Sequence, residues 1–243
     1  MGSGKYSALS GAVSREQAIN NIAANLANVN TTGFKKDRLS FAAILQSTQQ
    51  TEKATGINHT RVQTTETDFS QGGLRTTGRP MDVAIDGAGF FKIMKDNTTL
   101  YTRSGSFVLD SNGLVKTADG YTVIGNDDAP LQLDTTTGKD IAIGESGEIA
   151  VNGTLSGNRL VVFNVPDPKA LVKLNGNLYR LDTGEGQPMQ EYRVVQGCLE
   201  TSNVNMMEEM TSMIAAQRLF EAHTKAIESF AKISEKQDEL GSL

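Results

Sequence analysis

All five prolines of this 243-residue chain lie between residues 80 and 188. Proline inside a helix removes a backbone hydrogen bond and clashes with the preceding turn, so long helices are possible in the proline-free segments 1–79 and 189–243. Parts of both segments have apolar residues at helical spacing, whereas the middle has short β-branched runs between glycine-containing turns. We therefore predict a mainly β protein with a helix near each end.

Apolar residues of the first segment recur mostly at spacings of three and four, as on one face of an amphipathic helix. Ser14-Arg15-Glu16-Gln17 has the composition of a capping box that can restart a helix, and Gly33 can adopt the left-handed conformation that often stops one. We expect this helix to end near Val29–Thr32. Its apolar stripe consists of Tyr6, Leu9, Val13, Ile19, Ile22, Leu26 and Val29.

A second, longer helix is predicted at the other end. Polar residues within 202–205 can cap its N-terminus, and Glu208 and Glu209 place negative charge at the positive end of its dipole. It can continue to about Glu239, with a stripe of Met206, Met210, Met213, Phe220, Ile227 and Phe230. Because each stripe is too narrow to form a core alone, we expect the two helices to pair as a coiled coil. The alternative is that both pack on the β domain.

The central region is divided by short turn sequences that contain glycine, which we interpret as hairpin turns. They are Asp86-Gly87, Asn112-Gly113, Asp119-Gly120, Ser146-Gly147, Asn152-Gly153 and Asn175-Gly176. The strands predicted between them include 107–109, 114–115, 121–124, 141–143, 148–151 and 160–163. No pattern of helical length interrupts them, so the sheet is predicted to be antiparallel.

This pattern divides the chain into four parts. We expect an N-terminal helix at 1–34, an extended connector rich in Thr, Gln and Ser at 35–80, an antiparallel β domain at 81–200 and a C-terminal helix at 201–243. A connector of this length would be unusual within one compact domain.

The composition argues against the common kinds of enzyme and binding site. The formal net charge is −5, and no stretch combines Lys and Arg with aromatic residues, so nucleic-acid binding is not expected. One cysteine, Cys198, and two histidines, His59 and His223, leave too few ligands for a zinc site or an acid–base pair. We expect no catalytic, cofactor-binding or metal-binding residues, and we interpret Cys198 as a buried structural thiol.

The chain is not expected to span a membrane, because it has no apolar run near the ~20 residues required. Its first nine residues lack the basic and apolar regions of a secretory signal peptide, so export would need another route. Two other functions stay open at this point. One is a monomeric β-rich binding module, and the other is a hydrolase, for which no carboxylate pair stands out.

Five asparagines lie within eleven residues of the first predicted helix: Asn20, Asn21, Asn25, Asn28 and Asn30. Asparagine is a poor helix former, so propensity does not explain this enrichment. An amide side chain can donate and accept hydrogen bonds at once. We therefore expect these residues to bind neighbouring chains in a packed array.

Two segments resemble a known family. Residues 24–35, Ala-Asn-Leu-Ala-Asn-Val-Asn-Thr-Thr-Gly-Phe-Lys, resemble the N-terminal signature of the bacterial flagellar axial proteins, the rod and hook family of the basal body. Residues 200–205, Glu-Thr-Ser-Asn-Val-Asn, with Glu208 and residues 213–218, resemble the C-terminal signature. Segments 74–91 and 101–107 are similar to the family as well. Residues 4–13 and the short length look most like proximal-rod members, with distal-rod members as the alternative, and Cys198 departs from the usual aliphatic or aromatic residue.

The resemblance implies a structural protein that is not an enzyme and needs no cofactor. Its terminal helices would form the inner tube of the rod, which transmits torque in the periplasm, and the β domain would lie outside. The implied partners are other rod proteins, copies of the same chain and the flagellar type III export apparatus, through which it would pass unfolded. The predicted subunit-interface residues are Leu9, Val13, Ile22, Asn25, Leu26, Asn28, Thr32, Gly33, Phe34, Ser202, Asn203, Val204, Asn205, Met210, Met213, Phe220 and Ile227.

Overall fold

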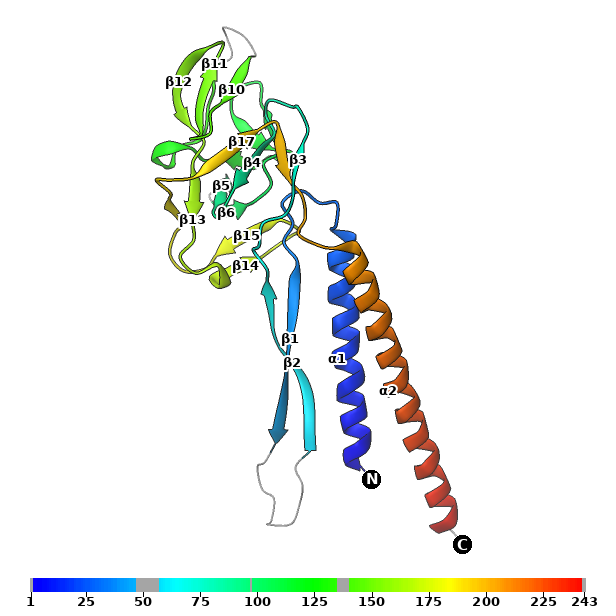
Figure 1. Ribbon diagram of the computed structural model, residues 1–243. Coiled ribbons are helices and arrows are strands. Elements are labelled where there is room, and N and C mark those ends of the chain that lie inside the picture. The colour runs from blue at the N-terminus through cyan, green and yellow to red at the C-terminus, as the bar shows by residue number, and fades with distance from the viewer. Residues whose placement is uncertain (1, 47–56, 97, 135–139, 242–243) are drawn as a thin grey trace. The chain divides into compact units, whose positions relative to one another are not determined.

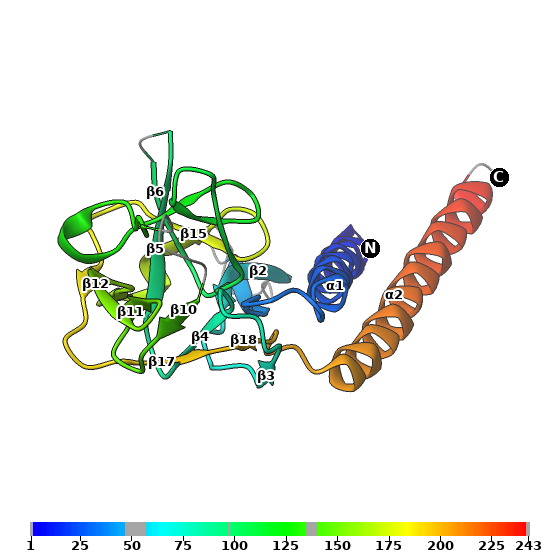
Figure 2. The ribbon, with the colours of Figure 1, turned by 90° about the horizontal axis from the view of Figure 1, so that it is seen from above.

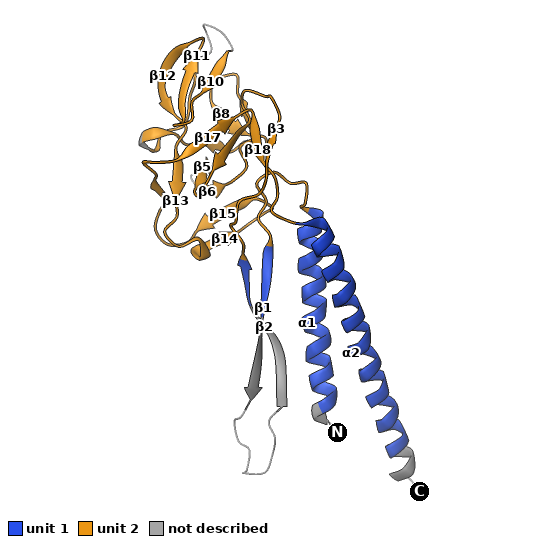
Figure 3. Ribbon diagram, in the orientation of Figure 1, with its two compact units in different colours: residues 1–27, 37–66, 205–243 blue, residues 28–36, 67–204 orange. Residues whose placement is uncertain are grey.

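The computed structural model describes residues 2–46, 57–96, 98–134 and 140–241 and divides into two compact units (Figure 3). The helix unit consists of residues 1–27, 37–66 and 205–243, and the β unit of residues 28–36 and 67–204. The prediction of a mainly β protein with a helix near each end is confirmed. Figure 1 labels the elements.

The helix unit contains two long helices and a two-stranded sheet. Helix α1 covers Gly2–Ala27 and helix α2 covers Met206–Gly241, so α2 is the longer of the two (Figures 1 and 2). Strands β1 (Asp37–Gln46) and β2 (Ile57–Thr67) pair with each other. The side chains of residues 41–63, including His59, lie outside the described residues.

The helix ends differ from the predicted ones at three points. Helix α1 runs through Ser14, whose hydroxyl donates to Ser10 O at 2.8 Å, so the predicted capping box is wrong. It ends at Ala27 rather than at 29–32, because Thr31 folds back on Asn28 with a backbone and a side-chain hydrogen bond. Helix α2 extends slightly beyond Glu239. The polar cap is confirmed, since Asn205 Oδ1 accepts from Met207 N at 3.1 Å.

The β unit is built from short strands. Their bounds are β3 (Leu74–Thr76), β4 (Val83–Asp86), β5 (Phe90–Lys95), β6 (Thr98–Thr102), β7 (Phe107–Leu109), β8 (Val115–Thr117), β9 (Thr122–Val123), β10 (Ile141–Ile143), β11 (Glu148–Val151), β12 (Thr154–Arg159), β13 (Val162–Asn164), β14 (Leu171–Lys173), β15 (Leu178–Leu181), β16 (Gln187–Pro188), β17 (Arg193–Gln196) and β18 (Cys198–Glu200). Two short 3-10 helices cover Asn126–Asp128 and Pro168–Ala170.

The main sheet has nine strands, seven of them in the order β14-β15-β6-β5-β9-β8-β7, with β13 and β16 branching from β5. Strands β10, β11 and β12 form a second sheet, and β17-β4 and β18-β3 are separate pairs. Every pair whose register is described in the β unit is antiparallel, which confirms that prediction.

Most of the predicted turns join paired strands. Asn152-Gly153 links β11 to β12, and both residues have positive φ, 50° and 77°, as a type I′ turn requires. Asp86-Gly87 is the exception. It lies between β4 and β5, which do not pair with each other, so it is a turn but not a hairpin.

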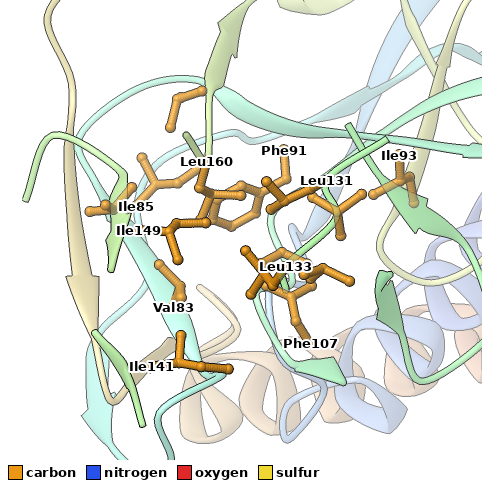
Figure 4. Packing of buried hydrophobic residues seen from close by; sticks show 14 of the residues in the cluster. Val83, Ile85, Phe91, Ile93, Phe107, Leu131, Leu133, Ile141, Ile149 and Leu160 are labelled. Carbon is orange, nitrogen blue, oxygen red and sulfur yellow. The ribbon is translucent and has the colours of Figure 1, made fainter. Parts of the chain in front are cut away.

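Aliphatic and aromatic side chains from both larger sheets form the main core of the β unit. Figure 4 shows them packed together, with the Phe91 and Phe107 rings edge to face at 5.1 Å. A second cluster surrounds Phe90 and Tyr179, and Phe69 packs against both rings. Cys198 is half-buried, 3.7 Å from Thr76 Oγ1, so the expectation of a buried thiol is wrong. Cys198 lies on short strand β18, which pairs with the exposed strand β3, and this position explains its exposure.

Candidate functional site

The two helices contact each other through small residues of α1. A β-carbon on Gly11 would lie 2.5 Å from His223 Cε1, and one on Gly4 would lie 3.0 Å from Phe230 Cζ. Seven residues forward along α1 thus correspond to seven residues back along α2, which defines an antiparallel pair (Figure 1). Continuing this register by seven residues pairs Ala18 with Ala216, and both are buried. We call the set Gly4, Ala8, Gly11, Ala18, Ala216, His223 and Phe230 the helix seam.

Three larger apolar residues of the predicted α1 stripe lie away from the seam. Tyr6, Leu9 and Val13 of α1 are 62%, 49% and 45% exposed. The expectation that this stripe faces α2 is therefore wrong for these three residues, because glycine and alanine allow the helix backbones to approach more closely. Helix α2 also exposes large apolar residues near its start. Tyr6, Leu9 and Val13 lie toward one end of the helix pair, and Met206, Met207, Met210 and Ile214 lie toward the other. We call these two exposed groups together the apolar face.

Asn25 is buried near the end of α1 and binds the backbone of the next segment. Its Nδ2 donates to Asp37 O at 2.9 Å, and its Oδ1 accepts from Asp37 N at 3.0 Å. The amide therefore satisfies both peptide groups at the start of β1, as a neighbouring strand would. Asn20 and Asn30 are exposed. The hypothesis that the asparagines bind neighbouring chains stays a prediction, but Asn25 has partners within its own chain.

Within the β unit, the segment that follows α1 lies against the segment that precedes α2. Gly33 N donates to Glu200 O at 2.9 Å, and Lys36 N donates to Asn203 Oδ1 at 2.8 Å. Gly33 has φ +68°, and a β-carbon there would lie 2.5 Å from Ser104 N, so only glycine fits. We call residues 28–36 and 198–204 the junction.

The sides of the junction are also fixed within the β unit. Phe34 is buried, and Lys173 Nζ lies 3.9 Å from the centroid of its ring, in cation–π geometry. Asn177 Nδ2 donates to Thr32 O at 3.0 Å. On the other segment, Asn203 Nδ2 donates to Asp68 O at 2.8 Å. These contacts fix the positions at which both segments leave the β unit.

The predicted interface residues thus fall into two groups. The helix unit holds exposed Leu9, Val13, Asn205 and Met210, half-buried Ile22, Leu26, Met213, Phe220 and Ile227, and buried Asn25. The junction holds Asn28, Thr32, Gly33, Phe34, Ser202, Asn203 and Val204. The structure brings the members of the second group together from opposite ends of the sequence.

Sequence reasoning missed a buried ionic cluster beside these residues. Lys35 Nζ lies 2.5 Å from Glu200 Oε1, and Arg103 Nη1 lies 3.3 Å from Glu200 Oε2. The side chains of Lys35 and Glu200 are fully buried, and that of Arg103 is 3% exposed. Burial lowers the pKa of Lys35, against the opposing influence of the Glu200 carboxylate. All three residues lie in segments that resemble the family. The one local signal of their burial in the sequence is that the charged residue Glu200 directly follows apolar Leu199.

Among the described residues, no three His, Cys, Asp or Glu side chains are grouped as a metal site requires. Neither α1 nor α2, over its described length, is long and apolar enough to cross a membrane.

Three family models match the chain. Residues 6–35 match "Flagella basal body rod protein", residues 84–151 match "Flagellar hook protein FlgE/F/G D1 domain", and residues 195–239 match "Flagellar basal body rod FlgEFG protein C-terminal". The flagellar basal-body rod protein FlgG of Borreliella burgdorferi is 35% identical, over 92% of this chain and 93% of the relative. The chain belongs to the flagellar basal-body rod protein family. The rod protein FlgG of Bacillus subtilis is 32% identical, over 91% and 92%, and the rod protein FlgF of Caulobacter vibrioides is 30% identical, over 94% of both chains.

At the level of the family, this rod protein is a structural component of the flagellar basal body. The matches to the first and third models cover most of the two helices and of the junction. The first reaches from Tyr6 in α1 to Lys35 in the junction, and the third from Val195 through the junction into α2. Both ends of the rod protein therefore combine a helix with one segment of the junction.

Proposed function

We propose that this chain is a structural subunit of the flagellar rod that assembles, through its helix unit, with other rod proteins and with copies of itself. The observation that carries this proposal is the apolar face. Small residues of α1 make the contact with α2, and large ones such as Leu9, Val13 and Met210 remain exposed. Large apolar side chains left exposed in this number mark protein contacts.

For the detailed geometry of the helix pair, the proposal is coiled-coil packing of α1 and α2. Among the buried and half-buried positions of both helices, one series follows alternating steps of four and three, which average the 3.5 residues of a heptad repeat, while buried Ala12 and Ser14 lie outside it. The positions of the series are Gly4, Ala8, Gly11, Arg15, Ala18, Ile22 and Asn25 on α1, and Glu209, Met213, Ala216, Phe220, His223, Ile227 and Phe230 on α2.

The predicted interface residues take two roles in this proposal. Leu9, Val13 and Met210 contact neighbouring subunits directly, and the half-buried stripe residues complete those contacts. Gly33, Phe34, Asn203 and Val204 act through the junction, by fixing where the helices connect to the β domain. The four-part division predicted from the sequence then separates helices for assembly from a β domain outside the tube.

Within the family, the proposal is a proximal-rod subunit of the FlgF type. The alignment with FlgF of Caulobacter vibrioides takes 231 positions to cover 94% of this chain, whereas that with FlgG of Borreliella burgdorferi takes 249 positions to cover 92%. The FlgG relative therefore carries more inserted residues. Percent identity does not favour the FlgF type, because the FlgG relative is 35% identical to this chain and the FlgF relative is 30% identical. A distal-rod subunit is the alternative.

The proposal includes delivery of the unfolded chain by the flagellar type III export apparatus. The single cysteine supports this route, because an internal disulfide would prevent a chain from threading through a narrow channel. The substrate of that apparatus is then the chain itself, and the protein has a mechanical rather than a catalytic role.

Val13→Asp tests the assembly surface. Val13 is 45% exposed, so the isolated chain should stay folded, whereas a carboxylate buried in a subunit contact would be strongly unfavourable. We expect cells carrying Val13→Asp to lose motility and the protein to be absent from purified basal bodies. Asn112→Asp, at the exposed tip of the β7-β8 turn, is the matched control and should assemble normally. Normal incorporation of folded Val13→Asp would refute the proposed surface.

A further inference from the structure

Glu200 connects three parts of the β unit that are far apart in the sequence. Its Oε1 accepts from Lys35 Nζ and from Gly72 N, at 2.5 and 3.0 Å, and its Oε2 faces Arg103 Nη1 at 3.3 Å. Its backbone carbonyl accepts from Gly33 N at 2.9 Å. One residue of the C-terminal junction segment thus binds the N-terminal segment, the chain before β3 and the end of β6.

Glu200 supplies the one negative charge that contacts both cations of this cluster. Lys35 and Arg103 are two buried cations, and the Glu200 carboxylate is the buried anion that contacts both. Even so, Arg103 Nε has no hydrogen-bond partner within the described part of the chain. Removing one partner from a buried ion pair is far more destabilising than never forming the pair, because the remaining charge stays without compensation.

The remaining contacts of the two cations cannot replace the carboxylate. Lys35 Nζ also donates to Ser70 O at 2.7 Å, and Arg103 Nη2 donates to Gly87 O at 2.8 Å. These are neutral carbonyl oxygens, which satisfy a donor but do not neutralise a charge. Without Glu200, burial of Lys35 would leave two like charges in one buried region, and the Asp68 carboxylate would offset the charge of Lys35 less than Glu200 does.

We propose that Glu200 is a latch that allows the two junction segments to dock onto the β unit only together. The N-terminal segment cannot bury Lys35 until Glu200 arrives, and the C-terminal segment cannot bury Glu200 without Lys35 and Arg103. A chain that emerges N-terminus first therefore completes its β unit only when residue 200 is available. Opening of the junction releases both segments in one event.

Three backbone amides report on this event in the full chain. Asp68 N donates to Lys36 O and reports on the N-terminal segment, Thr201 N donates to Gly73 O and reports on the C-terminal segment, and Gly33 N donates to Glu200 O between the two segments. In the unmodified protein, hydrogen exchange at increasing urea should give the same opening constant and the same urea dependence for all three amides. Opening constants that differ more than tenfold would overturn the proposal, because the segments would then open independently.

Two variants test the charge argument. Glu200→Gln keeps the shape of the side chain but removes its charge, and should speed exchange at all three amides at least tenfold. Lys35→Met together with Glu200→Gln removes one uncompensated cation and should reverse much of that increase. Glu145→Gln breaks the exposed pair between Arg193 and Glu145 and should leave the three amides unchanged.

Each outcome of the variant experiment either supports or contradicts the role of Glu200 as a latch. Exchange that is unchanged in Glu200→Gln, or a double variant that exchanges no more slowly than Glu200→Gln, contradicts the latch. If Glu200→Gln does not fold, a folded double variant supports it. If neither variant folds, the opening constants of the unmodified chain decide.

Discussion

The side-chain amide of Asn25, at the end of α1, bonds the backbone at the start of β1 as a neighbouring strand would. Asparagine is unfavourable inside helices because its side chain competes for backbone hydrogen bonds. At position 25 that tendency is useful, since the side chain bonds both peptide groups of Asp37 where β1 begins. The identity of this residue is therefore explained by the chain's own fold, although the sequence alone suggested contacts with neighbouring subunits.

Asn25→Ala should destabilise the helix unit. Two hydrogen bonds to Asp37 are lost, and the gain in helix propensity offsets part of that loss, so we expect a net decrease of about 1–2 kcal/mol in the free energy of unfolding. Urea unfolding followed by far-UV circular dichroism measures it. Asn30→Ala, at an exposed position, should change stability by less than about 0.5 kcal/mol. Equal effects of the two substitutions would show that the Asn25 bonds contribute little.

The turn between β7 and β8 contains a carboxylate with a predictable pH response. Lys116 Nζ, at 2.5 Å, and then the Ser111 N–H hold the pKa of Asp110 below its ordinary value. Folding lowers this pKa, so the stabilisation is present above the unfolded value and is lost as pH falls through the folded value. We expect Lys116→Met to raise the pKa of Asp110, as measured by NMR titration of its carboxyl carbon. Lys169→Met, in a different loop, should leave that pKa unchanged.

At the scale of elements, the strands were easier to predict than the faces of the helices. Strands 107–109, 141–143 and 148–151 are confirmed to the residue, because β-branched runs and glycine turns are local signals. The face of α1 was mispredicted because apolar periodicity follows large side chains, whereas the contact with α2 depends on Gly4 and Gly11. Small residues carry little hydrophobic signal, so the sequence does not show that they mark a close helix contact.

The candidate site, like the helices, could be predicted only in part from the sequence. The signature residues around Gly33 and Asn203 were recognised, but their pairing could not be derived from local patterns. Lys35, Arg103 and Glu200 meet only because β18 pairs with β3 and brings Glu200 next to a segment that is distant in sequence. Such a cluster depends on tertiary contacts, which spacing along a single sequence does not specify.

Because Gly11 lies close to His223, Gly11→Ala should change the stability of the helix pair in opposite directions in the presence and in the absence of the His223 side chain. In the natural chain, Gly11→Ala places a methyl group against the imidazole and should destabilise the helix pair by about 1–3 kcal/mol. In a His223→Ala background the space is free. The same substitution should then stabilise α1 by up to about 1 kcal/mol, because alanine favours the helix over glycine. Far-UV circular dichroism during urea unfolding of the four chains completes the cycle, and the same sign in both backgrounds would contradict the contact.

At the scale of the whole molecule, the two units bury different kinds of side chain. The β unit buries valine, isoleucine and phenylalanine in its core, whereas the described part of the helix pair buries mostly alanine and glycine. Stabilisation by burial is about 25 cal/mol per Å² of apolar surface, so an alanine seam contributes much less than a core of branched and aromatic side chains. The helix unit is therefore expected to be the less stable part of an isolated subunit.

Hydrogen exchange of the isolated and assembled protein tests this difference. In the isolated subunit, amides of residues 5–27 and 206–235 should exchange faster than those of β5, β6 and β15, because the apolar face is still exposed to water. In assembled rods the same helical amides should become strongly protected, since burial of that face adds stability to the helices. Protection of the helices equal to that of the β core in the isolated subunit would mean that the seam alone is sufficient. The apolar face would then not be needed for the stability of the helices, and its exposure would need another explanation.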